Sequence, residues 1–134
     1  MDIKEKIDFV TNISDARLMD GAIQKPPQSV KIELTARCNL RCKFCAVHTR
    51  KGSPPKDMTL DYFKKITMDM RLCNVREIGL FFLGESFTAP RLLIDACKWC
   101  KEIGIPYVFL TSNAVGAKTE YVEELMAAGL DSLK

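Results

Sequence analysis

The chain has 134 residues, of which 47% are hydrophobic and 28% charged, the balance of one globular domain and not of a disordered chain. Its formal net charge of +3 is too small to indicate a nucleic-acid partner. The longest apolar run, residues 78–83, is far shorter than the roughly 20 residues of a membrane span, and the N-terminus lacks the apolar core of a signal peptide. The composition therefore predicts a soluble cytoplasmic protein with no membrane partner.

Residues 1–28 are predicted to form an N-terminal helix and a linker. Ile3, Ile7 and Val10 lie at helical spacing, and the prolines of Lys25-Pro26-Pro27 would end a helix there. The remaining residues, 29–134, are expected to form the folded domain.

Four segments of this domain have the apolar pattern of strands, and they are residues 30–34, 78–83, 107–110 and 130–133. In the first, Val30, Ile32 and Leu34 alternate with polar residues, which is typical of a strand with one buried face. The second is apolar without alternation, as expected of a parallel strand that is covered on both faces.

Three amphipathic helices are expected between these strands. Thr59 is a predicted N-cap of the first, Thr88 and Pro90 start the second, and Thr119 caps the third. The side chains predicted to face the core are Phe63, Ile66, Met70 and Cys73, then Leu93, Cys97, Cys100 and Ile103, and finally Val122, Leu125 and Met126. The alternation predicts an α/β fold with a parallel sheet. It contains three βα units and the start of a fourth strand, so it is either part of a longer barrel, which is favoured, or a small open sheet.

Polar or reactive residues follow each of the first three strands, in residues 35–38, 84–86 and 111–113. In parallel α/β folds, the loops at the carboxyl ends of the strands carry the functional groups. We therefore expect one site at this edge of the sheet.

Three cysteines dominate the first of these loops. Cys38, Cys42 and Cys45 have C-x3-C-x2-C spacing, and thiolates are the ligands that zinc and iron–sulfur clusters prefer. Three thiolates on a four-iron cluster leave one iron open to a small molecule. Solvated loop charge is the simplest interpretation of each of the basic residues around them, which are Arg37, Arg41, Lys43, Arg50, Lys51 and Lys56.

Zinc is the alternative metal for this loop. His48 follows Cys45 by three positions, so Cys38, Cys42, Cys45 and His48 supply the ligands of a Cys3His site. The protein would then be a zinc-stabilised α/β binding module. Against this, structural zinc usually organises a small module, whereas this loop lies on a βα repeat with its own core.

The cysteine loop, with the aromatic Phe44 before its last cysteine, resembles the signature of the radical S-adenosylmethionine (radical SAM) enzymes. Met58-Thr59-Leu60, Gly84-Glu85 and Thr111-Ser112-Asn113 follow in the order and spacing of the SPASM and cofactor-biosynthesis branch. Two motifs depart from the family pattern. The usual Gly-Gly-Glu-Pro is Leu83-Gly84-Glu85-Ser86 here, and Thr-Asn-Gly is Ser112-Asn113-Ala114.

The resemblance implies the first part of a partial (βα)6 TIM-like barrel, with a [4Fe-4S] cluster on Cys38, Cys42 and Cys45. S-adenosylmethionine would bind the fourth iron and be cleaved reductively to a 5′-deoxyadenosyl radical, which abstracts hydrogen from an unknown substrate. A flavodoxin or ferredoxin would supply the electron. A non-catalytic cluster-binding fragment is a further alternative.

The resemblance also assigns residues to S-adenosylmethionine. Backbone around Phe44 would contact the adenine, Gly84 and Glu85 would form the edge that receives the methionine amino group, and Ser112 and Asn113 would lie nearby. Outside these motifs, Cys97 and Cys100 are spaced as C-x2-C, but their place on an inner helical stripe predicts buried core residues. Cys73 has the same interpretation.

Overall fold

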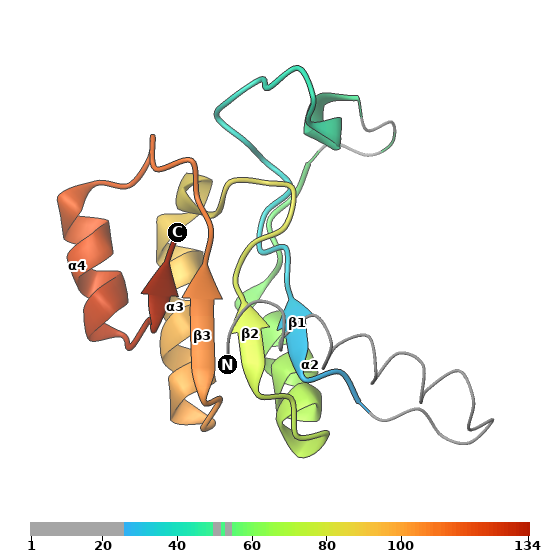
Figure 1. Ribbon diagram of the computed structural model, residues 1–134, viewed down its shortest axis with the longest axis vertical. Coiled ribbons are helices and arrows are strands. Elements are labelled where there is room, and N and C mark those ends of the chain that lie inside the picture. Colours follow the sequence, from blue (N-terminus) through green and yellow to red (C-terminus); the bar gives the residue numbers. More distant parts are fainter. Residues whose placement is uncertain (1–25, 50–51, 53–54) are drawn as a thin grey trace, which may run out of the picture.

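The computed structural model describes residues 26–49, 52 and 55–134, so the helix predicted within residues 1–25 lies outside the described part. A four-stranded sheet has the order β1-β2-β3-β4, with every neighbouring pair parallel. The strands are β1 (Ser29–Lys31), β2 (Glu77–Gly79), β3 (Tyr107–Leu110) and β4 (Ser132–Leu133). Their order along the chain is their order in the sheet (Figure 1). The predicted parallel α/β fold is confirmed.

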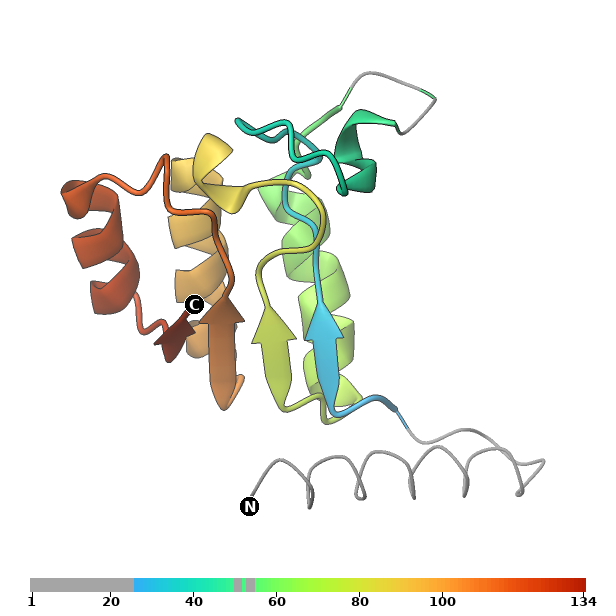
Figure 2. The ribbon, with the colours of Figure 1, turned by 45° about the horizontal axis from the view of Figure 1, so that its top comes forward.

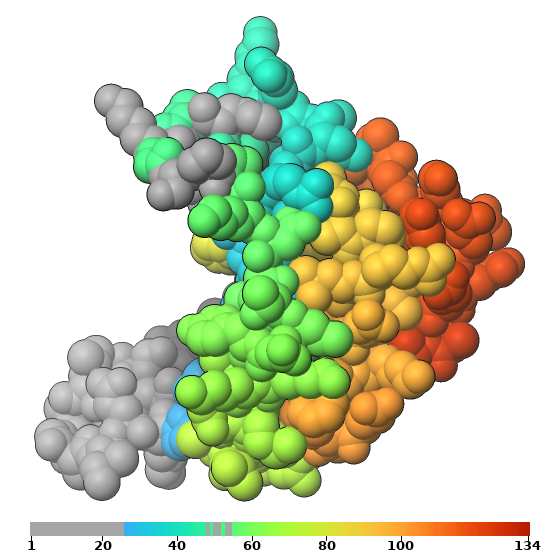
Figure 3. Space-filling model, turned by 180° about the vertical axis from the view of Figure 1, so that it is seen from behind, coloured from blue at the N-terminus to red at the C-terminus, as the bar shows by residue number. Residues whose placement is uncertain are grey.

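The helices α2 (Leu60–Leu72), α3 (Pro90–Glu102) and α4 (Thr119–Ala127) connect these strands. They lie side by side on one side of the sheet (Figure 2), as right-handed crossovers require. Seen from behind, they form a continuous layer that runs from α2 through α3 to α4 (Figure 3). No helix in the described ranges is long and apolar enough to cross a membrane.

The core lies between this helical layer and the sheet. Alternate residues of the strand segments point into it, and they are Ile32, Leu34, Ile78, Leu80, Val108 and Leu110. The helices contribute Phe63, Leu93, Cys97, Cys100 and Leu125, all without exposed surface. Burial raises the pKa of the Cys97 thiol to about 11 and that of Cys100 to about 12. The prediction that these two cysteines are core residues is confirmed.

Strands β1, β2 and β4 are shorter than the predicted segments, and β4 begins only at Ser132. The pairing of β1 and β2 with their neighbours continues only briefly, through Ile32 N–H to the Gly79 carbonyl at 2.8 Å and Leu80 N–H to the Phe109 carbonyl at 2.9 Å. Beyond these points the chains separate, because the Leu34 carbonyl accepts instead from Met58 N–H at 2.7 Å. Some of the apolar residues that follow these strands still pack in the core, so hydrophobicity alone overestimates the length of the strands.

The helix ends confirm some predictions and correct others. The Thr59 hydroxyl accepts from Tyr62 N–H at 3.3 Å, as predicted for an N-cap. Thr119, in contrast, is the first residue of α4 and follows the cap position at Lys118, so the predicted cap is wrong. Helix α3 begins at Pro90, as predicted, but Thr88 does not start it, because Thr88 ends the short 3₁₀ helix Ser86–Thr88 and its hydroxyl donates to the Glu85 carbonyl at 2.7 Å.

Two predicted core side chains are exposed. Cys73 lies one residue beyond the end of α2, and its backbone has left helical geometry, so its side chain leaves the stripe. Met126 is 52% exposed because Leu125, its neighbour on α4, takes the buried position, and adjacent helical residues point about 100° apart.

Asp131 anchors the start of β4. Its Oδ2 accepts from Val108 N–H at 2.7 Å and from Lys101 Nζ at 2.9 Å. Burial acts to raise the pKa of this carboxyl, but the hydrogen bonds from Val108 and Lys101 and the lysine charge lower it overall.

Candidate functional site

The loops after β1, β2 and β3 meet at the carboxyl-end edge of the sheet (Figure 1). Glu85 N–H donates to the Arg37 carbonyl at 2.7 Å, which joins the first two loops. Asn113 N–H donates to Glu85 Oε2 at 2.9 Å, and Asn113 Nδ2 donates to Asn39 Oδ1 at 2.8 Å. The third loop therefore contacts both of the others, as the sequence predicts for loops at one edge of a parallel sheet.

The cysteine loop is closed at its base by a short antiparallel contact. Thr35 and Asp57 form an isolated bridge, and Ala36 N–H donates to the Lys56 carbonyl at 3.3 Å. Arg37 reinforces this closure, since its Nε and Nη2 donate to the two carboxylate oxygens of Asp57 at 3.0 and 2.6 Å. Residues far apart in the sequence thus hold the two ends of the loop together.

Arg37 has a structural role that its interpretation as a solvated loop charge missed. Its Nη2 also donates to the Thr88 carbonyl at 3.1 Å, so it joins the base of the cysteine loop to the loop after β2. Burial acts to raise the pKa of its partner Asp57, but hydrogen bonds from Thr35 and Arg37 and the arginine charge lower it overall. Arg50 and Lys51, from the same basic set, lie outside the described residues.

The three cysteines of the loop are half-buried free thiols. Cys45 N–H donates to the Cys42 carbonyl at 3.0 Å, and Leu40 N–H approaches Cys38 Sγ at 3.5 Å. Among the described residues, no three Cys, His, Asp or Glu side chains are grouped so that they could hold a metal ion. The structure therefore places the thiols on one short loop but does not bring them into ligand geometry.

Phe44 and His48 are the two other residues of interest on the cysteine loop. Phe44 is 94% exposed at the turn between Cys42 and Cys45. His48, the fourth ligand of the zinc alternative, ends a short 3₁₀ helix, Ala46–His48, and its side chain lies outside the described part. The structure therefore gives no support to the Cys3His set.

Glu85 is the centre of a hydrogen-bond network. The residue is only 4% exposed. Its Oε1 accepts from Phe87 N–H at 3.0 Å and from Ser112 Oγ at 2.8 Å, and its Oε2 accepts from Asn113 N–H. Both carboxylate oxygens are therefore used within the protein. Three predicted site residues, Glu85, Ser112 and Asn113, are in direct contact.

Gly84 lies against the backbone of the first loop. A Cβ atom at this position would lie 1.9 Å from the Thr35 carbonyl oxygen, so no other residue fits there without displacing the backbone. The N–H groups of Leu83 and Gly84 both donate to Glu33 Oε1, at 3.1 and 3.0 Å. The sequence pattern does not single out Glu33, because a carboxylate on the polar face of a strand segment is typical of a solvated side chain and its two partners lie about fifty residues further along.

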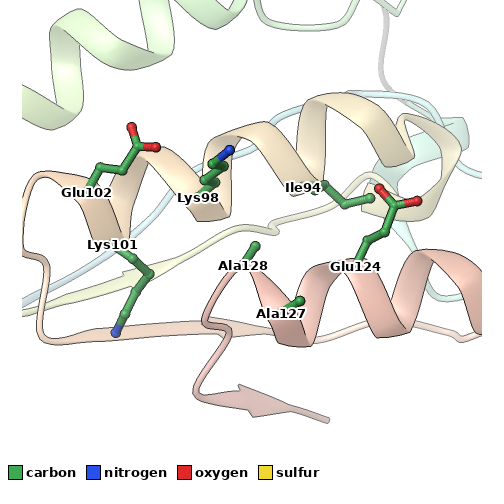
Figure 4. A pocket seen from close by; sticks show the side chains of 7 residues that line it. All are labelled: Ile94, Lys98, Lys101, Glu102, Glu124, Ala127 and Ala128. Carbon is green, nitrogen blue, oxygen red and sulfur yellow. The ribbon is translucent and has the colours of Figure 1, made fainter.

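Two cavities lie away from this edge. An apolar groove of about 600 Å³ follows α2 beside Pro27 and Val30. A groove of about 400 Å³ lies between α3 and α4 on the outer surface, lined by Ile94, Lys98 and Glu124 among others (Figure 4). Neither groove contains a predicted site residue.

The profile of the Radical SAM superfamily matches residues 32–134, and the chain belongs to this family. Over 104 residues it is 31% identical to the PqqA peptide cyclase of Bradyrhizobium diazoefficiens, an alignment that covers 78% of this chain and 27% of the cyclase. The chain thus spans about 27% of the length of that curated relative.

Two solved structures share the fold. BtrN in complex with AdoMet and 2-DOIA superposes with a TM-score of 0.70 at 17% identity, over 79% of this chain and 44% of BtrN. Streptococcus suis SuiB bound to precursor peptide SuiA superposes with a TM-score of 0.61 at 22% identity, over 92% of this chain and 27% of SuiB. The α/β fold is therefore that of radical SAM, TIM-barrel-like proteins.

Proposed function

We propose that this chain is the cluster-binding part of a radical SAM enzyme and that Cys38, Cys42 and Cys45 hold a [4Fe-4S] cluster with one iron open to S-adenosylmethionine. When bound, these two groups supply reductive cleavage of S-adenosylmethionine and a 5′-deoxyadenosyl radical that abstracts hydrogen from a substrate. Family membership over residues 32–134 is the observation that carries the proposal.

The donor set of the cysteine loop fits a cluster. Three thiols are half-buried and free, and they lie on the loop after β1, in which Asn39 accepts a hydrogen bond from Asn113 of the loop after β3. Soft thiolate ligands suit iron–sulfur clusters, and exposed Arg41 and Lys43 place positive charge on the same loop, which would partly offset the negative charge of a bound cluster. Cluster binding requires residues 38–45 to draw the three sulfurs together, while the Arg37–Asp57 pair keeps the ends of the loop in place.

The neighbouring loops supply the surface for S-adenosylmethionine. Both carboxylate oxygens of Glu85 already accept hydrogen bonds from Phe87, Ser112 and Asn113. The carboxylate therefore positions the loop after β2, and the backbone of this loop would receive the methionine ammonium group. Ser112 and Asn113 hold this loop to the loop after β3. The backbone around Phe44, at an exposed turn of the cysteine loop, would contact the adenine.

The proposal includes a one-electron donor, such as a flavodoxin or ferredoxin. Arg41 and Lys43 are exposed on the cysteine loop, and they are the side chains that an acidic redox protein would meet beside the cluster. The relatives named above include a peptide cyclase and a protein bound to a precursor peptide. The chain spans only about a quarter of that cyclase, so the proposal here concerns cleavage of S-adenosylmethionine and not a particular substrate.

Electron paramagnetic resonance tests this function. The chain is reconstituted anaerobically with iron and sulfide, reduced with dithionite, and recorded with and without S-adenosylmethionine. We expect about four iron atoms per chain and a reduced-cluster signal that changes when S-adenosylmethionine is added. A signal that ignores S-adenosylmethionine would instead indicate a non-catalytic cluster-binding fragment.

Matched variants make the test specific. Cys42→Ala should lose the cluster, whereas Cys73→Ala, which removes an exposed cysteine outside the loop, should keep it. Stoichiometric zinc without iron, lost in His48→Ala, would contradict the proposal and favour the zinc module.

A further inference from the structure

Glu33 anchors a turn that lies about fifty residues away in the sequence. It follows the buried Ile32 on the opposite face of the first strand segment and is itself half-buried. One of its carboxylate oxygens, Oε1, accepts from two consecutive backbone N–H groups, those of Leu83 and Gly84, at 3.1 and 3.0 Å. Hydrogen bonds from N–H groups to a carboxylate are stronger than those to neutral acceptors, so this contact holds the turn firmly.

The contact decides where the carbonyl groups of the turn point. In a trans peptide the N–H and C=O groups point in opposite directions, and the described chain has no cis peptide bond. Holding the N–H groups of Leu83 and Gly84 on Glu33 therefore directs the Phe82 and Leu83 carbonyls away from Glu33. The Glu85 N–H, which donates to the Arg37 carbonyl at 2.7 Å, fixes the Gly84 carbonyl in the same way.

These three carbonyls form a row of available acceptors. None of the hydrogen bonds among the described residues is accepted by the carbonyl oxygen of Phe82, Leu83 or Gly84. The next carbonyl, that of Glu85, is already occupied by Thr88 N–H and the Thr88 hydroxyl at 3.0 and 2.7 Å. An unpaired row of carbonyl oxygens, with a carboxylate fixed behind it, suits a cation that carries several N–H donors.

We propose that Glu33 is a positioning residue for S-adenosylmethionine, because it aims this carbonyl row at the place where the cofactor's ammonium group binds. The inference rests on the function proposed above. Glu33 itself does not touch the cofactor. It acts through the Leu83–Gly84 backbone, with Gly84 pressed against Thr35. Glu33 contributes to cofactor binding by accepting these two hydrogen bonds. A general attraction between its negative charge and the cofactor is a different effect, which the proposal does not require.

Two variants and one control test the proposal. Glu33→Ala removes the acceptor, Glu33→Gln keeps an Oε1 acceptor without the charge, and Glu77→Ala removes an exposed carboxylate at the far end of β2. Amide hydrogen exchange, followed by NMR, reports directly on the Leu83 and Gly84 N–H groups. Calorimetric titration of the reconstituted chain with S-adenosylmethionine reports affinity, and the cluster signal without S-adenosylmethionine reports whether the cysteine loop is intact.

We expect Glu33→Ala to exchange these two amides at least about tenfold faster and to weaken S-adenosylmethionine binding about tenfold, with the cluster signal unchanged. Glu33→Gln should stay within about threefold of the parent chain in both measurements, and Glu77→Ala should match the parent. Unchanged affinity in Glu33→Ala, despite faster exchange, would overturn the proposal. So would Glu33→Gln binding as weakly as Glu33→Ala while its two amides remain protected.

The two proposals fail in different ways. If the parent chain forms no cluster or ignores S-adenosylmethionine, the proposed function fails, and the positioning role of Glu33 fails with it. If the parent binds S-adenosylmethionine and Glu33→Ala binds it equally well, only the role of Glu33 fails. The exchange rates show in either case whether the carboxylate holds the turn.

Discussion

Replacing Gly84 with alanine tests the contact that joins the loops after β1 and β2. The added Cβ would lie 1.9 Å from the Thr35 carbonyl oxygen and 3.0 Å from the Arg37 carbonyl oxygen. Carbon and oxygen atoms do not approach closer than about 3 Å without repulsion, so the turn must move by more than an ångström. Both close atoms belong to the backbone, and no rotation of a side chain can relieve the overlap.

The size of the effect follows from the hydrogen bonds that such a movement breaks. Gly84 and Leu83 donate to Glu33 at 3.0 and 3.1 Å, and Glu85 donates to the Arg37 carbonyl at 2.7 Å. A shift of an ångström takes all three beyond hydrogen-bonding distance. At roughly 1 kcal/mol for each bond, the free energy of unfolding should fall by about 3 kcal/mol.

Urea denaturation measures this loss. With a denaturant dependence of about 1.5 kcal/mol/M, a loss of about 3 kcal/mol lowers the midpoint by about 2 M. Gly116→Ala is the matched control, because its Cβ would meet Phe87 at 3.3 Å, a tight but tolerable distance, and it should lose less than about 1 kcal/mol. Equal and small losses in the two variants would refute the close approach at Gly84.

Three further predictions concern the core and the site. Cys97 and Cys100, with pKa values raised to about 11 and 12, should resist a thiol reagent at pH 8 in the folded chain and react in urea; rapid labelling of the folded chain would contradict their burial. Burial acts to raise the pKa of Asp131, yet its hydrogen bonds lower it overall. The stability that it contributes is therefore present above its unfolded pKa of about 4 and is lost as the pH falls through the lower folded pKa. Asp131→Asn should reduce the acid sensitivity of the denaturation midpoint, and an unchanged pH profile would count against this. Glu85→Gln and Ser112→Ala share one hydrogen bond, so a double-mutant cycle should give a coupling of about 1 kcal/mol, and additive losses would show that the bond contributes nothing.

Periodicity predicted the elements of the fold well because burial and pattern agree in them. The residues of β3, Tyr107–Leu110, are those that the sequence predicts, and the helix after Thr59 begins where its cap indicates. The predicted strand ends beyond β1 and β2 failed for a physical reason. The Leu34 carbonyl pairs with Met58 and not with a neighbouring strand, and this long-range choice leaves no local trace in the sequence.

The candidate site was predictable where chemistry is tied to spacing. The cysteine loop, Gly84-Glu85 and Ser112-Asn113 were expected at one edge of the sheet, and the hydrogen bonds of Glu85 do join the last two. Glu33 could not be assigned a role in this way. A single carboxylate on the polar face of a strand has the pattern of a solvated side chain, and its two partners lie fifty residues further along.

The edge formed by the loops after β1 and β2 is held by carboxylates that accept backbone N–H groups. Glu33 accepts from the N–H groups of Leu83 and Gly84. Glu85 accepts from those of Phe87 and Asn113. Carboxylates can only accept, so they fix N–H groups and leave carbonyl oxygens unpaired. In the proposed complex this arrangement directs free carbonyl oxygens toward the ammonium group of S-adenosylmethionine, while the basic side chains of Arg41 and Lys43 are exposed on the cysteine loop. The carbonyl row and the cysteines belong to different loops, so Glu33→Ala should weaken S-adenosylmethionine binding and leave the cluster signal unchanged.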